Sequence, residues 1–269
     1  MLDCKDIYTP MDSKIGYKLV PNKGLATKDT IKWYQGVIGS LLYLTLGTRP
    51  DIAYSVIKLS RYNTNPSEEH IVAVKRILRY IKATINYSIT YYKSENSHYI
   101  QAYTDADYAR DINTAKSTTS YIFYIANSPI SWKSKLQTII AQSTTEAEYI
   151  AINSTAKEAI YIKSILDELG YYQQNKLPIY SDNNGALLLA KNPVFHEKTK
   201  HISVKYHYTR DLIDKGIIDL IYINTSEQKA DGLTKALEKI KFKGFLNYLY
   251  TKERTSSRFY LLEINYNYY

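Results

Sequence analysis

The sequence contains a single cysteine, Cys4, and no apolar run long enough to cross a membrane. One cysteine excludes an internal disulfide framework and a cysteine-based zinc finger, and it suits a reducing compartment. The longest apolar stretch, Val37 to Leu46, is interrupted at Gly39, whereas a membrane-spanning helix needs about 20 apolar residues. Met1 to Asp6 lacks the basic start and apolar core of a signal peptide. We therefore expect a soluble, intracellular protein without a membrane segment.

The composition is that of a globular protein with an excess of positive charge. The 269 residues suffice for one large domain or two modest ones. Hydrophobic residues make up 45% of the chain and charged residues 23%, which are ordinary values. The net charge of +9 suits a polyanionic partner, although many basic proteins have no role with nucleic acids.

The first third of the chain has a helical pattern. Residues 1–30 carry prolines and glycines without a sustained period, which indicates an irregular lead-in. Trp33 to Leu46 reads as a helix that Gly47 ends, and Pro50 suits the first turn of a second helix that reaches about Arg61. Ser67 is placed to cap a third helix.

That third helix has a basic face formed by Lys75, Arg79 and Lys82, opposite its apolar positions. Charged residues at helical spacing form a solvated face in many globular proteins. A row of cations can also hold the phosphates of a nucleic acid. Both interpretations are open from the sequence, and the second makes these three residues candidates for nucleic-acid binding.

After about residue 95 the pattern changes from helical to extended. Tyr99 to Asp105 and Thr118 to Ala126 read as strands, and Ile130 to Lys133 reads as a third strand after a turn at Asn127 to Pro129. Three consecutive strands predict an antiparallel meander.

The second half of the chain alternates between helices and strands, which predicts a mixed sheet with helices packed on it. In order, we expect a helix from Thr144 to Leu169, a strand from Leu177 to Ser181, a helix from Asn184 to Lys191, a helix from Val204 to Lys215, a strand from Ile217 to Ile223, and a helix from Glu227 to about Ile240.

Glu148 stands where the long helix ought to be apolar. Ser143 followed by Glu146 reads as a capping box that starts this helix. Glu148 lies on the same stripe as Ile152 and Ala156. A carboxylate on a buried stripe costs free energy unless it is paired, hydrogen-bonded or bound to a metal. The alternative is a solvated first turn, since the helix dipole favours acids there.

Three further acids occupy comparable places. Asp105 ends the first strand, Asp182 follows the fourth, and Asp231 falls in the last expected helix. Strand ends and helix starts beside one sheet are where α/β proteins build sites. Carboxylates held close together repel one another, and an oxygen-only set suits Mg²⁺ or Mn²⁺. Two such ions would clamp the attacking water and the leaving oxygen of a phosphodiester.

Each of these acids has a simpler interpretation. Asp107 lies on the same strand face as Asp105, and the local pattern does not choose between them. Asp182 could cap the following helix. Asp231 could be an ordinary exposed residue, although the neighbouring Gly232 disfavours a helix by about 1 kcal/mol and hints at close approach by another group.

Six motifs in order resemble the ribonuclease H domain of copia-type retrotransposon polyproteins. The resemblance covers about residues 98 to 238. The motifs are Tyr103–Ala109, Ser131–Gln137, Ser143–Ala151, Ser181–Ala186, Thr199–His207 and Gln228–Lys235.

This resemblance implies a ribonuclease H-like fold, an α/β mixed five-stranded sheet flanked by helices. It implies that the metal-binding tetrad of the family falls on Asp105, Glu148, Asp182 and Asp231, holding two Mg²⁺ or Mn²⁺ ions. The implied reaction is endonucleolytic cleavage of the RNA strand of an RNA–DNA hybrid. Discrimination for RNA would come from contacts to 2′-hydroxyls across the wide minor groove. Ser120 and Tyr161 depart from the glycine and tryptophan usual in the family, and both read as packing changes.

Upstream motifs resemble the region just after the polymerase palm of the same polyproteins, at Gly36–Leu44, Thr48–Tyr54 and His70–Lys82. Polymerase chemistry needs an Asp-Asp pair, and no two aspartates are adjacent in this chain. We therefore expect the C-terminal part of a polyprotein.

The expected domain order begins with the irregular lead-in of residues 1–30. A small helical, thumb- or connection-like region follows at residues 31–95. The ribonuclease H-like domain then covers residues 98–238, and a C-terminal tail covers residues 239–269.

The expected partners are an RNA–DNA hybrid and the rest of a retroelement polyprotein, with no membrane. The expected location is the cytoplasm or nucleus, or a virus-like particle if the element is active. Two alternatives compete with the hybrid ribonuclease. One is an inactive remnant that binds nucleic acid, and the other is a different nuclease of the same fold.

Overall fold

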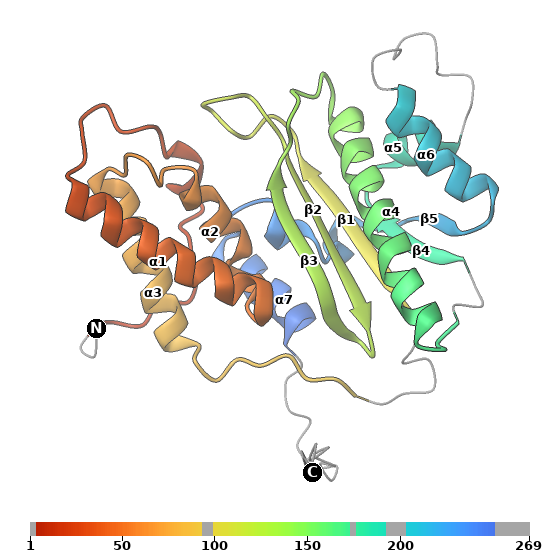
Figure 1. The fold of residues 1–269 in the computed structure, drawn as a ribbon, viewed down its shortest axis with the longest axis horizontal. Coiled ribbons are helices and arrows are strands. Elements are labelled where there is room, and N and C mark those ends of the chain that lie inside the picture. The colour runs from red at the N-terminus through yellow and green to blue at the C-terminus, as the bar shows by residue number, and fades with distance from the viewer. Residues whose placement is uncertain (1–3, 93–98, 173–175, 192–202, 251–269) are drawn as a thin grey trace.

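The computed structural model describes residues 4–92, 99–172, 176–191 and 203–250. Its centre is one sheet with helices on both faces (Figure 1). Within the described part of the chain, no helix is both long and apolar enough to pass through a membrane.

The sheet has the mixed five-stranded arrangement that the sequence predicted. Its order is β3-β2-β1-β4-β5, with β2 antiparallel to β1 and β3, and with β4 parallel to β1 and β5. This is the ribonuclease H-like topology. The strands are β1 (Gln101–Asp107), β2 (Thr118–Ile125), β3 (Ser128–Leu136), β4 (Leu177–Ser181) and β5 (Ile218–Tyr222).

The turn between β2 and β3 differs from the expected one. Ala126 and Asn127 both have positive φ, 51° and 59°, which is the backbone of a two-residue hairpin turn whose twist matches the flanking strands. The tight turn lets β3 begin at Ser128 instead of Ile130. Pro129 is tolerated there because β3 is an edge strand.

The two faces of the sheet carry different helices (Figure 1). One face is covered by α4 (Thr144–Glu168), α5 (Asn184–Lys191) and α6 (Ser203–Asp214). The other face contacts α2 (Ala53–Ser60) and α7 (Lys239–Leu249), and α1 (Lys28–Gly47) and α3 (Glu68–Ala83) pack against α2. Strand residues alternate accordingly, since Ala102 packs in the α4 core and Tyr103 in the other core.

The N-terminal helices agree with the expected ones apart from their ends. Ser67 caps α3 as predicted. The first helix begins at Lys28, before the expected Trp33, because the Thr27 side chain accepts a hydrogen bond from the amide of Thr30 at 3.2 Å. The expected second helix is a 3-10 turn at Pro50–Ile52 that leads into α2.

The helix expected from Glu227 to Ile240 is wrong. The chain forms two short 3-10 turns, η5 (Thr225–Glu227) and η6 (Asp231–Leu233), before α7 begins at Lys239. Gly232 explains part of the difference, because a Cβ there would lie 2.4 Å from the ring of Phe245. The close approach that Gly232 suggested is therefore made by a side chain of α7.

Part of the expected C-terminal tail is folded. Phe242, Phe245 and Leu249 of α7 are buried in the core shared with the N-terminal helices. The Tyr250 hydroxyl donates a hydrogen bond of 2.7 Å to Asp51, so this end of the chain is tied to the N-terminal helices. The rest of the expected tail, residues 251–269, lies outside the described residues.

Candidate metal centre

Three of the four predicted acids converge at one edge of the sheet. One carboxylate oxygen from each of Asp105, Glu148 and Asp182 lies within 4.8 Å of the others. The strand register explains two of these positions. Tyr103 of β1 pairs with Tyr180 of the parallel β4, so the residues two further along, Asp105 and Asp182, lie side by side where β4 ends. Asp105 does not end its strand as expected, because β1 continues to Asp107.

Glu148 reaches the cluster from the first turns of α4, which packs across β1. The Ser143 hydroxyl accepts the amide of Glu146 at 3.1 Å, and the Glu146 carboxylate accepts the amide of Gln142 at 2.8 Å. The Ser143 side chain therefore caps the helix, as the sequence predicted, whereas Glu146 binds the amide one residue before the cap and not that of Ser143. Glu148 sits at the head of the buried stripe that continues through Ile152.

Asp231 approaches the same cluster from the other side. It opens η6 and forms an ion pair with Lys235. The Thr234 hydroxyl contacts both the Asp105 carboxylate, at 2.7 Å, and the Asp231 carbonyl, at 3.0 Å, so the two acids lie close together. Besides burial, the charge of Asp231 raises the pKa of Asp105. Asp231 is therefore neither in an α-helix nor freely exposed, although its oxygens are not within the tight group that the other three acids form.

The local alternative for Asp182 does not hold. The residue that caps α5 is Asn183, whose side-chain oxygen accepts a hydrogen bond of 2.9 Å from the amide of Ala186. Asp182, one residue earlier, is left to turn toward Asp105 and Glu148. Of the two residues that follow β4, Asp182 therefore belongs to the acidic cluster and Asn183 caps α5.

Asp107 is also separated from the cluster. Its carboxylate accepts a hydrogen bond from the amide of Thr118, where β1 and β2 part. Burial raises the pKa of Asp107 to about 6. The structure thus resolves the choice that the strand pattern left open, because Asp105 and not Asp107 lies with Glu148 and Asp182.

The cluster concentrates negative charge in a buried place. Asp105 and Glu148 are 5% and 4% exposed. Burial raises the pKa of Glu148 well above its ordinary value, and the charges of Asp105 and Asp182 raise it further. Burial also raises the pKa of Asp105, as do the charges of Asp231 and Asp182. Each acid disfavours ionisation of the others unless positive charge is supplied.

The residues fit a divalent cation. Glu148 Oε2 is buried and has no hydrogen-bond partner, and leaving such an atom unsatisfied costs free energy. An oxygen-only donor set of carboxylates is what Mg²⁺ and Mn²⁺ prefer. Asp105, Glu148 and Asp182 would be the ligands, with Asp231 beside them.

Sequence reasoning gave no hydrogen-bonding role to the groups that hold Asp231 and Asp105 in place, and it interpreted Ser120 only as a packing change. Gln228 donates a hydrogen bond of 2.9 Å to the carbonyl of Thr104 and accepts the amide of Ala230 at 3.1 Å. The Ser120 hydroxyl donates to the carbonyl of Ala230 at 3.1 Å. The segment before Asp231 is thus fastened to β1 and β2. Polar residues inside the motif Gln228–Lys235 were the available signal.

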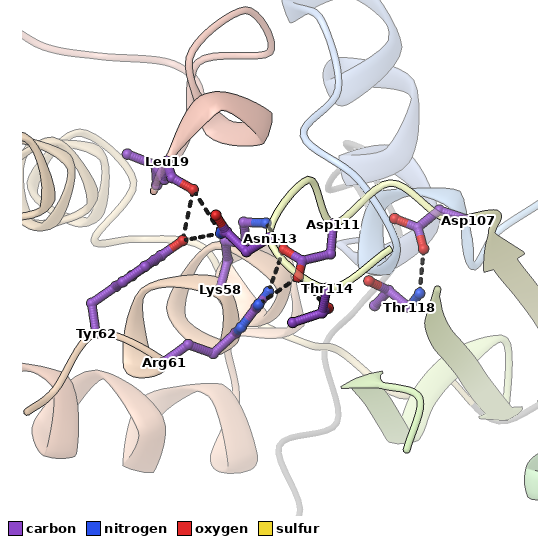
Figure 2. Close-up of polar contacts among 9 residues, drawn as sticks. All are labelled: Leu19, Lys58, Arg61, Tyr62, Asp107, Asp111, Asn113, Thr114 and Thr118. Atoms are coloured by element: carbon purple, nitrogen blue, oxygen red, sulfur yellow. Dashed lines mark hydrogen bonds and ion pairs between the residues drawn. The ribbon is translucent and has the colours of Figure 1, made fainter. Parts of the chain in front are cut away.

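The loop after Asp107 is fastened to the helical region (Figure 2). Asp111 accepts hydrogen bonds from Lys58 at 2.9 Å and from Arg61 at 2.9 and 2.7 Å. Although burial acts in the opposite direction, the hydrogen bonds from Arg61, Thr114 and Lys58 hold the pKa of Asp111 well below its ordinary value. The N-terminal helices therefore support the strand end that carries the acidic cluster.

The basic face of α3 lies against the N-terminal segment. Arg79 donates to the carbonyl of Lys5 at 3.2 and 3.0 Å, and Lys82 donates to the carbonyl of Cys4 at 3.1 Å. Lys75 is exposed and lines a pocket next to Trp33. Two of the three candidate phosphate ligands thus bind the chain itself, and their role toward nucleic acid stays a prediction.

Comparison with known proteins extends the similarity along the chain. No protein-family model matches the sequence. The Retrovirus-related Pol polyprotein from transposon RE2 of Arabidopsis thaliana is 41% identical over 245 residues, covering 91% of this chain and 16% of that polyprotein. The corresponding polyprotein from transposon TNT 1-94 of Nicotiana tabacum is 42% identical, covering 90% and 18%. The chain spans less than a fifth of the length of these relatives.

Among solved structures, LC11-RNase H1 in complex with an RNA/DNA hybrid aligns with 14% identity and a TM-score of 0.38. The alignment covers 50% of this chain and 93% of that one.

Proposed function

The chain belongs to the family of copia-type retrotransposon Pol polyproteins, and we propose that it hydrolyses the RNA strand of RNA–DNA hybrids as their ribonuclease H part. The observation that carries this proposal is the meeting of Asp105, Glu148 and Asp182 within 4.8 Å. These acids come from a strand, a helix and a strand end that are distant in sequence, and nothing in their local structure requires them to meet.

The protein's contribution is to hold carboxylates that repel one another. Asp105 is fixed by β1 and by a hydrogen bond from Thr234 at 2.7 Å. Glu148 is fixed by the capped start of α4. When bound, two divalent cations supply the charge that activates the attacking water and stabilises the leaving oxygen of a phosphodiester. The burial of the two acids keeps bulk water away and strengthens their hold on cations.

Charge supports a nucleic-acid substrate. The chain carries a net charge of +9, which attracts a polyanion, and cations bound at the carboxylate cluster would neutralise its phosphate. The specific substrate that the family resemblance implies is the hybrid, with Mg²⁺ or Mn²⁺ as the metal. The wider polyprotein, with its polymerase, is the proposed molecular context.

Cleavage of an end-labelled RNA strand tests this function. The wild-type chain and the variant Asp105→Asn are incubated with Mg²⁺ and with the RNA as a hybrid, as a single strand and as an RNA duplex. An end-labelled DNA duplex is tested in parallel. We expect wild-type cleavage of the hybrid alone. Cleavage that Asp105→Asn retains in full would assign the activity to a contaminant. Cleavage of a DNA duplex in place of the hybrid would indicate a different nuclease of this fold.

A further inference from the structure

A pocket of about 310 Å³ lies next to the acidic cluster. Four basic residues line it, Lys14, Arg110, Lys235 and Lys241, together with the single acid Glu238. Lys235 joins the two places, because it lines the pocket and forms the ion pair with Asp231. A basic cavity therefore adjoins the carboxylates.

The fold collects these cations from separate parts of the chain. Lys14 belongs to the segment before α1, Arg110 follows the end of β1, and Lys241 lies in the first turn of α7. These residues are 96 and 131 positions apart (110−14=96; 241−110=131). Their gathering is not a local charge run of the kind that forms a solvated helix face.

Three of the four cations of the pocket have no ion-pair partner among the described residues. Within the described ranges, Lys235 is paired with Asp231, whereas Lys14, Arg110 and Lys241 form no ion pair. These three side chains are exposed. Glu238 can offset only one positive charge. Several positive charges around one cavity favour the binding of an anion, because the anion reduces the repulsion between them.

Two further donors suit an anion with several oxygens. The first turn of α7 has no acidic residue, and Glu238 makes no side-chain capping bond to it, so its free amides favour negative charge at this end. Tyr54 also lines the pocket. A phenol is protonated at neutral pH and can donate a hydrogen bond.

We propose that this pocket binds a backbone phosphate of the nucleic-acid strand whose neighbouring phosphodiester lies at the carboxylate cluster. The proposal rests on the proposed function, since it takes the substrate of that site to be a polynucleotide. Lys235 places the two sites side by side. The pocket would position the strand, while the carboxylates would act on it.

The proposal gives the outer parts of the chain a role in substrate binding. Lys14 and Tyr54 lie before the ribonuclease H-like region, and Lys241 lies after it. The N-terminal helices and α7 would then form part of the nucleic-acid surface, in addition to covering one face of the sheet. Arg110 belongs to the loop that Asp111 fastens to α2, which fixes the distance between the pocket and the cluster.

Binding of a fluorescent RNA–DNA hybrid to the full chain tests this pocket. The triple variant Lys14→Gln/Arg110→Gln/Lys241→Gln is compared with a control triple variant, Lys23→Gln/Lys28→Gln/Lys32→Gln. The control changes the net charge equally at exposed lysines that do not line the pocket. Affinity is measured with EDTA, which prevents metal-dependent cleavage, between about 50 and 200 mM salt. Thermal unfolding verifies that both variants fold.

We expect the pocket variant to bind at least about tenfold more weakly than wild type, the equivalent of one charge-assisted contact. Its salt slope should fall by about one unit for each phosphate that the pocket holds. The control variant should keep nearly the wild-type slope. Equal affinities and slopes for the two triple variants would overturn the proposal.

A hybrid with one phosphate replaced by a neutral methylphosphonate locates the contact. At one position the replacement should weaken binding to wild type but leave binding to the pocket variant unchanged, because both changes remove the same interaction. Additive losses at every position would overturn the proposal. Cleavage with Mg²⁺ is scored separately, so a chain that binds through the pocket without cutting would refute the proposed function and leave the phosphate site standing.

Discussion

The Thr234 hydroxyl donates a hydrogen bond of 2.7 Å to Oδ2 of Asp105. The two residues are 129 positions apart. Thr234 ends the 3-10 turn that begins at Asp231, and its hydroxyl also lies 3.0 Å from the Asp231 carbonyl. A single threonine thus ties the strand that carries one acid to the turn that carries another.

Replacing Thr234 by valine keeps the shape of the side chain and removes this hydrogen bond. Because the bond lowers the pKa of Asp105, the valine variant should raise that pKa and shift the rising limb of the pH-rate profile for hybrid cleavage to higher pH. The loss of stability should be about 1 kcal/mol. Thr234→Ser should restore the wild-type profile. An unshifted profile in Thr234→Val would show that the contact only fills space.

The raised pKa values of Asp105 and Glu148 predict a pH-dependent effect of metal on stability. Groups whose pKa rises on folding favour the folded state below their unfolded pKa of about 4, and this contribution is lost as the pH rises through the folded values. Mg²⁺ neutralises the ionised acids. It should therefore raise the unfolding temperature more at about pH 8 than at about pH 5. Equal shifts at both values would argue against binding at these acids.

Glu148→Gln isolates the contribution of one acid. Burial raises the pKa of Glu148 to about 10, so at about pH 8 the metal-free wild type must take up a proton at this side chain when it folds. Glutamine removes that cost, and the metal-free variant should therefore be more stable than wild type at about pH 8. The same variant should lose most of the stabilisation by Mg²⁺. Calorimetry with and without EDTA measures both effects, and a variant still stabilised as strongly as wild type would exclude Glu148 as a ligand.

Replacing Asp111 measures how much the contact between α2 and the loop after β1 contributes to the free energy of unfolding. Its side chain is 2% exposed and pairs with Lys58 and Arg61. Asp111→Asn should lower the free energy of unfolding by about 3–5 kcal/mol, because it leaves buried cations unpaired. The pKa of Asp111 is held low, so this contribution is present above about pH 4 and is lost as the pH falls.

A surface ion pair provides the control for Asp111. Asp211 pairs with Lys215 at 2.8 Å, but both side chains are more than half exposed. Asp211→Asn should cost less than about 1 kcal/mol. Urea unfolding of the two variants compares them directly, and similar losses would show that the loop contact carries little of the stability.

A residue larger than glycine at position 232, next to Asp231, would clash with the ring of Phe245. Gly232→Ala places a methyl group 2.4 Å from the Phe245 ring, which should destabilise the protein by about 1–3 kcal/mol and displace the turn. Gly39→Ala in α1 meets nothing within 4 Å and should stabilise the helix by about 1 kcal/mol. Opposite signs for the two variants in thermal unfolding are the expected result.

The sequence predicts those elements whose ends carry local signals. The strand Leu177–Ser181 and the helix Asn184–Lys191 agree with the structure at both ends, and Ser143 marks the start of α4. Gly170, with φ of +82°, follows the end of that helix. Such caps and turns act over a few residues and are visible without a fold.

The features that the sequence did not predict depend on contacts between segments that are distant in the chain. The turn at Asp231 is set by the hydrogen bond from Gln228 to Thr104 and by the ring of Phe245, which helical periodicity does not reveal. The basic face of α3 shows the same limit, because its pattern does not tell whether solvent, nucleic acid or the chain's own Lys5 covers it. The motifs selected the four acids, but the groups that position them required the structure.

The dependence of hybrid cleavage on Mg²⁺ tests the central claim most directly. Initial rates for wild type and Asp182→Asn are measured from EDTA through rising Mg²⁺ concentrations. If Asp105, Glu148, Asp182 and Asp231 hold two ions, wild type should not cut in EDTA, its rate should rise more steeply than the first power of low Mg²⁺ concentration, and Asp182→Asn should need far more metal. Cleavage that persists in EDTA, or a variant that matches wild type, would contradict the account.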